Sequence, residues 1–245
     1  MESNYLVDMS FVGTAYHGSQ IQNNAVTVQE VFQQGLKHIL GTLPDIKCCS
    51  RTDAGVHAIH FCISFHSDCG MDCGKMVMAL NAYLPDDIRV NSVKLVPEDF
   101  HARYSSLGKK YTYLVWNSRV MNPFYNERAF QFVPNIDAVK LNETAQAFLG
   151  SHDFSAFCSI KSDVQDKVRT VTEISVKRND ELVSFDISAD GFLYNMARII
   201  VGSLLQVARD RLNENDILSY LSGKPRDNKL ITVPSYGLYL SEVKY

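Results

Sequence analysis

The chain has 245 residues, 46% of them hydrophobic and 21% charged, and a formal net charge of −3. This composition is typical of a folded protein and argues against a fibrous or disordered chain. Because the net charge is slightly negative, nothing pulls the whole chain toward nucleic acid or an anionic membrane, and any polyanion has to be bound by a local basic region.

The N-terminal half predicts strands and helices in alternation. Residues 5–11 (YLVDMSF) predict a strand, and the glycine-punctuated turn VGTAYHGSQIQ follows. Thr27 and Glu30 form a capping box that starts an amphipathic helix. Residues 57–67 alternate as a strand with Phe61, Ile63 and Phe65 on one face, residues 75–82 predict a short helix, and residues 88–96 predict another strand.

Residues 97–110 break the periodicity and suggest a domain boundary. The elements predicted beyond it are a strand at 110–117, a helix at 137–149 closed by Gly150, two strands within 171–189, a long apolar helix, a polar helical segment and a final strand at 236–245. Short turns join adjacent strands, which favours an α+β fold with largely antiparallel sheets. We therefore expect two domains, 1–104 and 105–245.

No secretory or membrane segment is predicted. The N-terminus lacks a basic start followed by an apolar run, and the apolar stretch 191–208 is interrupted by Asn195, Arg198 and Gln206. We expect a cytoplasmic protein with that stretch as a buried helix. The six cysteines show no CxxC pair and are expected to be reduced thiols. A metal site at His66, Cys69 and Cys73 fits no common zinc spacing.

Asp53 is the first candidate for chemistry. It lies in a turn beside Gly55, where a ligand can approach the backbone closely, and Arg51 can keep the carboxylate ionised or hold a phosphate. An aspartate in such a loop is more often a turn-former or a cap. The residues alone therefore leave both interpretations open.

Arg198 is the second candidate, because it is the one charged residue between Gly191 and Ala208. A buried guanidinium must reach a carboxylate or an open cleft, although a helix-surface arginine can also extend to solvent. A third feature is the basic and aromatic run Phe100–Arg103 and Lys109–Tyr113, which is typical of surfaces that contact phosphates and stack on bases. An ordinary strand with half-buried tyrosines gives the same pattern.

Eight motifs in order then make the chain resemble the tRNA pseudouridine synthase A family. They are FVGTAYHGSQIQ (11–22) with Thr27-Val28-Gln29, SRTDAGVHA (50–58), NAYLPDDIRV (81–90), FHARYSS (100–106), KKYTY (109–113), SHDFSAF (151–157), MARIIVGSL (196–204) and VPSYGLYL (233–240). The resemblance implies the pseudouridine synthase fold, with two similar halves joined into one extended sheet and a central cleft. It also implies isomerisation of uridine at tRNA positions 38 to 40, in the anticodon arm, by a homodimer that needs no cofactor and no metal.

The resemblance assigns roles residue by residue. Asp53 corresponds to the catalytic nucleophile, Arg51 to the arginine that helps flip the uridine, Tyr111 to the tyrosine that stacks on the uracil, and Arg198 to the partner of the catalytic carboxylate. Arg103, Lys109 and Lys110 are expected to bind RNA. His57 is expected to shape the motif loop or to contact RNA.

Four departures from the family pattern leave the substrate range open. MARIIVG stands in place of the common MVRNIVG, TVPSYGLYL stands in place of TAPAxGLYL, and the other two are single residues. Ser50 replaces the glycine before the Arg-Thr-Asp triplet, and Lys110 replaces the arginine before the stacking tyrosine. The competing interpretation is a tRNA-binding or folding module without catalysis, or a paralogue that acts on other RNA uridines. A carboxylate-dependent hydrolase is disfavoured because a second well-placed acid is missing from the pattern.

Overall fold

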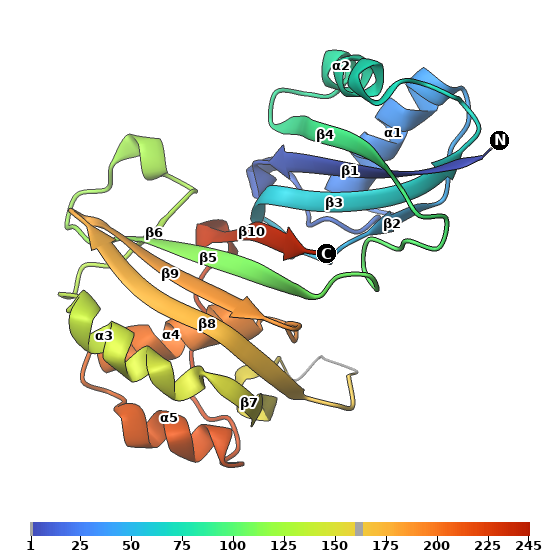
Figure 1. Cartoon of the computed structure of the whole chain (residues 1–245). Helices are drawn as coiled ribbons and strands as arrows, with labels where there is room; N and C mark the ends of the chain where they lie inside the picture. The colour runs from blue at the N-terminus through green and yellow to red at the C-terminus, as the bar shows by residue number, and fades with distance from the viewer. Residues whose placement is uncertain (1, 160–163) are drawn as a thin grey trace. The chain divides into compact units, whose positions relative to one another are not determined.

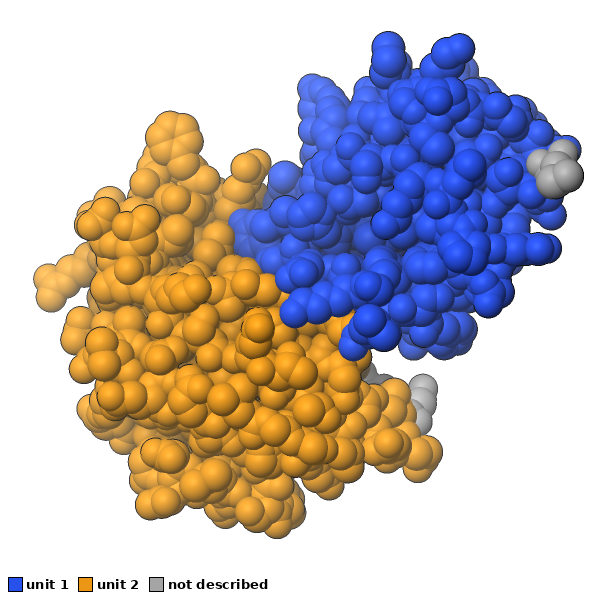
Figure 2. All heavy atoms as spheres, viewed as in Figure 1, with its two compact units in different colours: residues 1–107, 239–245 blue, residues 108–238 orange. Residues whose placement is uncertain are grey.

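A computed structural model of the chain describes residues 2–159 and 164–245. The chain divides into two compact units, drawn in different colours in Figure 2. Unit 1 contains residues Met1–Leu107 and Tyr239–Tyr245, and unit 2 contains Gly108–Leu238. Each unit has its own strands, its own helices and its own buried side chains (Figure 1).

Unit 1 is built on strands in the order β4-β1-β3-β10. The central β1 (Ser3–Phe11) is antiparallel to both β3 (His57–Ser67) and β4 (Ile88–Val96). On the other side of β3, β10 (Leu238–Lys244) pairs in parallel, and the short β2 (Ile46–Cys48) pairs antiparallel further along. The two ends of the chain therefore flank the same strand.

Two helices complete unit 1, α1 (Val28–Leu40) and α2 (Cys73–Tyr83), and they contact each other (Figure 1). The predicted N-cap is confirmed, since the Thr27 hydroxyl accepts a hydrogen bond from the Glu30 amide at 3.4 Å. The Asp72 side chain caps α2 in the same way, at 3.1 Å from the Lys75 amide. Val28, Phe32 and Leu36 of the predicted apolar stripe of α1 are buried, whereas Val31, Ile39 and Leu40 are half-buried.

Both faces of β3 are buried over much of its length. The predicted inward face is confirmed, because Phe61, Ile63 and Phe65 are at most 1% exposed. Ser64 on the opposite face is also buried. The reason is that the segment after β4 crosses this face, where the Ala102 amide donates to the Ser64 hydroxyl at 3.0 Å.

Unit 2 has strands in the order β5-β9-β8-β7, each antiparallel to its neighbour. Their bounds are β5 (Gly108–Trp116), β7 (Gly150–Asp153), β8 (Val168–Asn179) and β9 (Leu182–Ala189), with the two-residue β6 (Phe130–Gln131) parallel to β5. The predicted hairpin in 171–189 is confirmed, and Asp180 in its turn takes a positive φ of 52°.

The helices of unit 2 are α3 (Ala138–Ala145), α4 (Met196–Val207) and α5 (Glu214–Leu221). Short 3₁₀ turns lie at Gly13–Ala15, Pro123–Tyr125, Gln146–Phe148, Ser155–Phe157 and Ser235–Gly237. Every residue of α4 except Arg198 is buried, so the expected buried helix is confirmed. It begins at Met196 rather than near Gly191, because Asn195 takes a left-handed conformation with φ 64°.

These elements confirm the predicted α+β class with mainly antiparallel strands in each unit. The last strand differs from its predicted assignment. The sequence grouped residues 238–245 with the C-terminal domain, whereas β10 lies in unit 1 because it pairs with β3 at Tyr239 and Leu240. In the part of the chain that is described, no helix combines the length and the apolar character needed to cross a membrane.

Candidate active site

The segment that carries Asp53 is held by the glycine-rich turn that follows β1. Ser19, which is 1% exposed, binds both backbone groups of Thr52. Its amide donates to the Thr52 carbonyl at 3.1 Å, and its hydroxyl accepts from the Thr52 amide at 2.8 Å. Beyond Asp53, the Gly55 amide donates to the Tyr16 carbonyl at 3.2 Å. The backbone is therefore fixed on both sides of the carboxylate.

Two glycines of this turn approach the Asp53 segment so closely that a side chain would not fit. A Cβ atom on Gly13 would lie 1.9 Å from the Val56 carbonyl oxygen. One on Gly18, whose φ is +92°, would lie 2.5 Å from the Thr52 carbonyl oxygen. Val56 in turn donates its amide to the Asp53 carbonyl at 3.2 Å. The absence of side chains at Gly13 and Gly18 therefore allows the segment of residues 50–58 to pack directly against this turn.

His57 joins the same two segments from inside the core. Its side chain is 1% exposed, and its Nδ1 accepts a hydrogen bond from the Gly13 amide at 2.9 Å. An accepting Nδ1 leaves the proton of a neutral imidazole on Nε2. The ring also lies 4.7 Å from that of Tyr239. Of the two roles that the sequence left open for His57, this environment suits the shaping of the loop, since almost no surface remains for RNA.

Asp53 and Arg51 lie on the outside of this fixed loop. Asp53 is half-buried and Arg51 is exposed. Between them, the Thr52 hydroxyl oxygen is buried and has no hydrogen-bond partner among the described residues. The Asp53 carboxylate lies on a backbone held by hydrogen bonds and is two residues from the cationic Arg51, so it is well suited to act on a substrate that comes from solvent.

Tyr111 lies in β5 of unit 2 and is 7% exposed. Its ring meets Phe192 edge to face, with centroids 4.8 Å apart. Two residues on, Tyr113 has its hydroxyl bound to the Pro234 carbonyl at 2.8 Å. Burial raises the pKa of Tyr113, while the nearby charge of Arg198 opposes that shift. These two tyrosines point to the same face of β5 because strand side chains alternate.

The two lysines before Tyr111 are divided between the faces of β5 by the same alternation. Lys109 shares the face of Tyr111. Lys110 lies on the opposite face, where its Nζ is 3.7 Å from the Asp186 carboxylate. Thr112 also donates to that carboxylate, at 2.6 Å. The structure therefore gives Lys110 a partner within unit 2.

Arg198 is the half-buried exception on the otherwise buried α4. Its Nε donates to the Val233 carbonyl and its Nη1 to the Asn195 side chain, both at 2.8 Å. These bonds orient the guanidinium and tie α4 to the segment before β10. Arg198 belongs to unit 2 and Asp53 to unit 1, and their pairing stays a prediction.

Three supporting residues were not predicted from the sequence to belong to the site: Ser19, Phe192 and Asn195. A serine in a glycine-rich turn and a phenylalanine after a strand carry no distinctive signal. Asn195 did offer one, because asparagine is among the few residues that adopt the left-handed conformation readily. Arg103 is exposed in the turn before Leu107.

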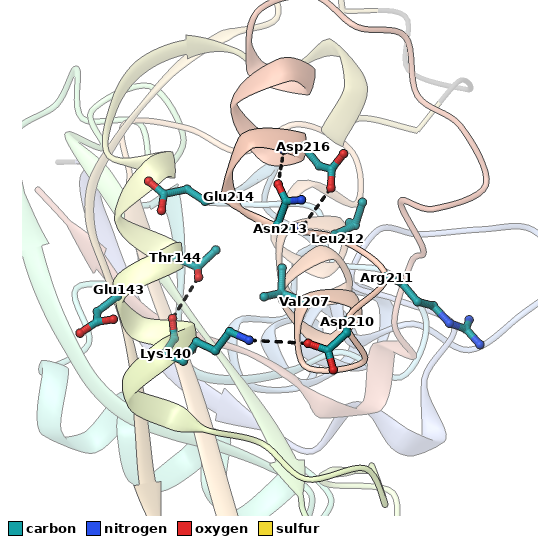
Figure 3. A pocket seen from close by; sticks show the side chains of 10 residues that line it. All are labelled: Lys140, Glu143, Thr144, Val207, Asp210, Arg211, Leu212, Asn213, Glu214 and Asp216. Atoms are coloured by element: carbon teal, nitrogen blue, oxygen red, sulfur yellow. Dashed lines mark hydrogen bonds and ion pairs between the residues drawn. The ribbon is translucent and has the colours of Figure 1, made fainter.

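A separate surface pocket in unit 2 contains none of the predicted site residues (Figure 3). It is lined by Lys140, Glu143, Thr144, Val207, Asp210, Arg211, Leu212, Asn213, Glu214 and Asp216. Several of its polar groups interact with each other: Lys140 lies 3.6 Å from the Asp210 carboxylate, and Asn213 and Asp216 form the capping box of α5. Within residues 2–159 and 164–245, no three His, Cys, Asp or Glu side chains are grouped as a metal ion would require. All six cysteines are free thiols.

Comparison with known proteins bears on this arrangement. A family model described as "tRNA pseudouridine synthase" matches residues 9–105 and 144–245. The chain is 40% identical over 237 residues to a tRNA pseudouridine synthase A of Acetivibrio thermocellus, a match that covers 97% of each chain. It is 41% identical over 239 residues to that of Ruminiclostridium cellulolyticum, again covering 97% of each, and 38% identical over 242 residues to that of a Thermoanaerobacter species, covering 99% of each.

Proposed function

The chain belongs to the tRNA pseudouridine synthase A family, and from that premise we propose that it converts uridines of the tRNA anticodon arm, at positions 38 to 40, to pseudouridine with Asp53 as the nucleophile. It is a tRNA pseudouridine synthase, an isomerase, and it has the pseudouridine synthase fold. The observation that carries the catalytic proposal is the half-buried Asp53 on a loop whose backbone is bound at Thr52 and at Gly55.

The reaction is an isomerisation whose atoms balance without a donor. The bond from N1 of uracil to C1′ of the ribose breaks, the base turns, and a bond from C5 to C1′ forms. C5 loses a proton and N1 carries one in the product. Asp53 either attacks C1′ to give a covalent intermediate or takes the C2′ proton to give a glycal. Both routes need an ionised carboxylate held in a constant position below the sugar.

The remaining residues take the roles that this chemistry requires. The uridine must leave its stack to be reached, so an aromatic platform is needed, and Tyr111 with its edge-to-face neighbour Phe192 provides one. Arg51 is exposed beside Asp53 and is assigned to flipping of the base. Arg198, oriented by its bonds to Val233 and Asn195, is assigned to the catalytic carboxylate.

Substitution of Asp53 tests the proposal. Asp53→Asn keeps the size of the side chain and removes the nucleophile, so tritium release from C5-labelled uridine in tRNA should be abolished. Affinity for tRNA should change little, because phosphate contacts supply most of it. Asp86→Asn is a matched control, since that carboxylate is fully exposed and pairs with Arg89. Normal turnover by Asp53→Asn would refute the mechanism.

The competing interpretation is a module that binds tRNA without chemistry. It predicts no tritium release from the unsubstituted protein and no loss of pseudouridine from the anticodon arm when the chain is removed from cells. Mapping of pseudouridine in tRNA from cells with and without the chain therefore decides between the two, and also reads out which positions are modified.

The RNA is expected to bind through local basic side chains, since the net charge is −3. Arg51, Arg103, Lys109 and Lys110 are the proposed phosphate contacts, and Lys110 also lies 3.7 Å from the Asp186 carboxylate. Affinity should fall steeply with added salt. A dissociation constant for tRNA that does not change with salt would contradict this proposal of basic contacts.

We also propose a cytoplasmic homodimer. Light scattering with and without tRNA tests the dimer.

A further inference from the structure

The turn from His101 to Ser105 in unit 1 is closed by several hydrogen bonds of its own. The His101 amide donates to the Ser105 hydroxyl at 3.0 Å, and the Ser105 amide donates to the His101 carbonyl at 2.9 Å. Inside the turn, Nδ1 of His101 accepts from the amides of Arg103 and Tyr104, at 3.1 and 3.4 Å. A turn with this many internal bonds has a defined shape before any ligand arrives.

The same turn is fastened to the sheet of unit 1. Ala102 is fully buried, its amide donates to the Ser64 hydroxyl at 3.0 Å, and its carbonyl accepts from the Tyr245 hydroxyl at 2.8 Å. Ser64 lies directly opposite Lys47 of β2 in the strand register. β3 and the residue that follows β10 therefore anchor the turn, and Lys47 lies beside it.

This anchored turn presents an aromatic ring to solvent. Tyr104 is 77% exposed, although its backbone is fixed. Its ring lies 4.4 Å from the ring of His101 and 5.8 Å from the guanidinium carbon of Arg103. Burial and the charges of Lys47 and Arg103 lower the pKa of His101, which keeps its Nδ1 able to accept the two amides. Asp45, which pairs with Lys47, opposes this shift.

A single exposed apolar side chain needs no explanation in an ordinary protein surface. Tyr104 differs because its backbone is held in a hydrogen-bonded turn, its ring lies against that of His101, and the Arg103 guanidinium lies near the ring. A rigid exposed ring flanked by basic side chains is the arrangement by which proteins stack unpaired bases while holding the adjoining phosphates. Because the backbone of the turn is already ordered, less conformational entropy is lost on binding than for a flexible loop.

We propose that Tyr104 is a stacking platform for an unpaired base of the bound tRNA, with Arg103 and Lys47 contacting the phosphates beside that base. The base is not the target uridine. Ser64 anchors the turn, and His57, at the start of β3, directly follows the segment that carries Asp53. The offset of seven residues along β3 between Ser64 and His57 corresponds to roughly 23 Å at the rise of a strand, so the turn lies far from Asp53. The inference rests on the proposed function only in taking tRNA as the ligand.

Three substitutions of Tyr104 separate stacking from other contributions. Tyr104→Leu keeps an apolar side chain and removes the aromatic face, so affinity for tRNA should fall about 5- to 150-fold, the equivalent of about 1–3 kcal/mol per stacked base. Tyr104→Phe and Tyr104→Trp keep the face and should bind within about twofold of the unsubstituted protein. Met78→Ala, at a 74% exposed position on α2, is the control and should bind normally.

The kinetics supply an independent readout. Tyr104→Leu should raise KM by the same factor and leave kcat within about twofold, because the ring does not touch the reacting atoms. The salt dependence of binding should stay as in the unsubstituted protein for Tyr104→Leu and become shallower by about one phosphate contact for Arg103→Gln. Circular dichroism confirms that each variant is folded.

Two results would overturn the inference: Tyr104→Leu binding tRNA as tightly as the unsubstituted protein, or Tyr104→Phe and Tyr104→Trp losing as much affinity as Tyr104→Leu. Failure of the proposed function gives a different result, namely tRNA that is bound without release of tritium. Loss of binding in Tyr104→Leu together with retention in Tyr104→Trp supports the stacking role even then.

Discussion

Gly13→Ala should nearly abolish turnover while leaving the protein folded. Heavy atoms in proteins essentially never come closer than 3.0 Å to a Cβ atom, and the Cβ of this variant would start 1.9 Å from the Val56 carbonyl oxygen. The backbones must therefore separate by about 1.1 Å. Val56 donates to the Asp53 carbonyl, so the shift is passed directly to the nucleophile. A misplacement of about 1 Å is enough to lower a rate about 100-fold.

The stability cost of Gly13→Ala must be separated from this effect. Overpacking of a tight contact typically costs about 1–3 kcal/mol. Gly41→Ala is a matched control, because Gly41 has a φ of +74° and open space around its Cβ position. It should lose about 1–2 kcal/mol of stability through backbone strain and keep its kcat. Tritium-release kinetics and thermal melts on both variants give the comparison. Gly13→Ala with normal kcat would refute the argument that this contact positions Asp53.

Three further predictions concern other parts of the fold. Gly35→Ala, in the middle of α1, should raise the free energy of unfolding by up to about 1 kcal/mol, because alanine favours a helix over glycine and the new methyl group would meet only ordinary contacts, at 3.4 Å. A lower melting temperature of the variant would contradict this prediction. Arg198→Lys should keep a small part of the activity that Arg198→Ala loses, since an ammonium cannot make both bonds of the guanidinium; equal kcat values for the two variants in tritium-release assays would contradict this. Stability should fall as the pH drops below about 6.5, because the pKa of His101 is lowered in the folded protein and the unfolded chain therefore takes up the proton first. His101→Asn keeps an acceptor that does not titrate, so its melting temperature should fall less between pH 7.5 and 5.5. An equal fall in the two proteins would contradict the assignment to His101.

Strands with one strongly apolar face were predictable from the sequence almost to the residue. The predicted strands at 57–67 and 88–96 have those bounds as β3 and β4, because alternation is a local property. Elements that depend on distant partners were not. The short β2 was missed since three residues show no period, and β10 was grouped with the wrong half because its partner β3 lies about 180 residues away.

In the site, too, local patterns were predictable and contacts between distant segments were not. The motif residues could be recognised in the sequence, but the contacts between one motif and another could not be predicted from it. Tyr16 of the first motif binds the Asp87 carboxylate of the third at 2.7 Å, while its carbonyl accepts from Gly55 of the second. Three segments spread over about 70 residues thus meet at Tyr16, beside the segment that carries Asp53. Most of the bonds between these segments involve at least one backbone atom, and a backbone partner leaves no mark on side-chain identity.

The structure also allows the two single-residue departures from the family pattern to be weighed. A glycine before the Arg-Thr-Asp triplet would matter if the backbone there needed a positive φ, but Ser50 does not take the left-handed conformation, so the substitution adds no backbone strain. Lys110 lies on the face of β5 opposite Tyr111 and pairs with Asp186 at 3.7 Å. A lysine there loses the bidentate fork of an arginine without disturbing the stacking face. Neither departure therefore imposes backbone strain beside Asp53 or changes the face of β5 that carries Tyr111. Restoring the family residues, as Ser50→Gly and Lys110→Arg, should leave kcat within about twofold, while any change appears in KM for tRNA.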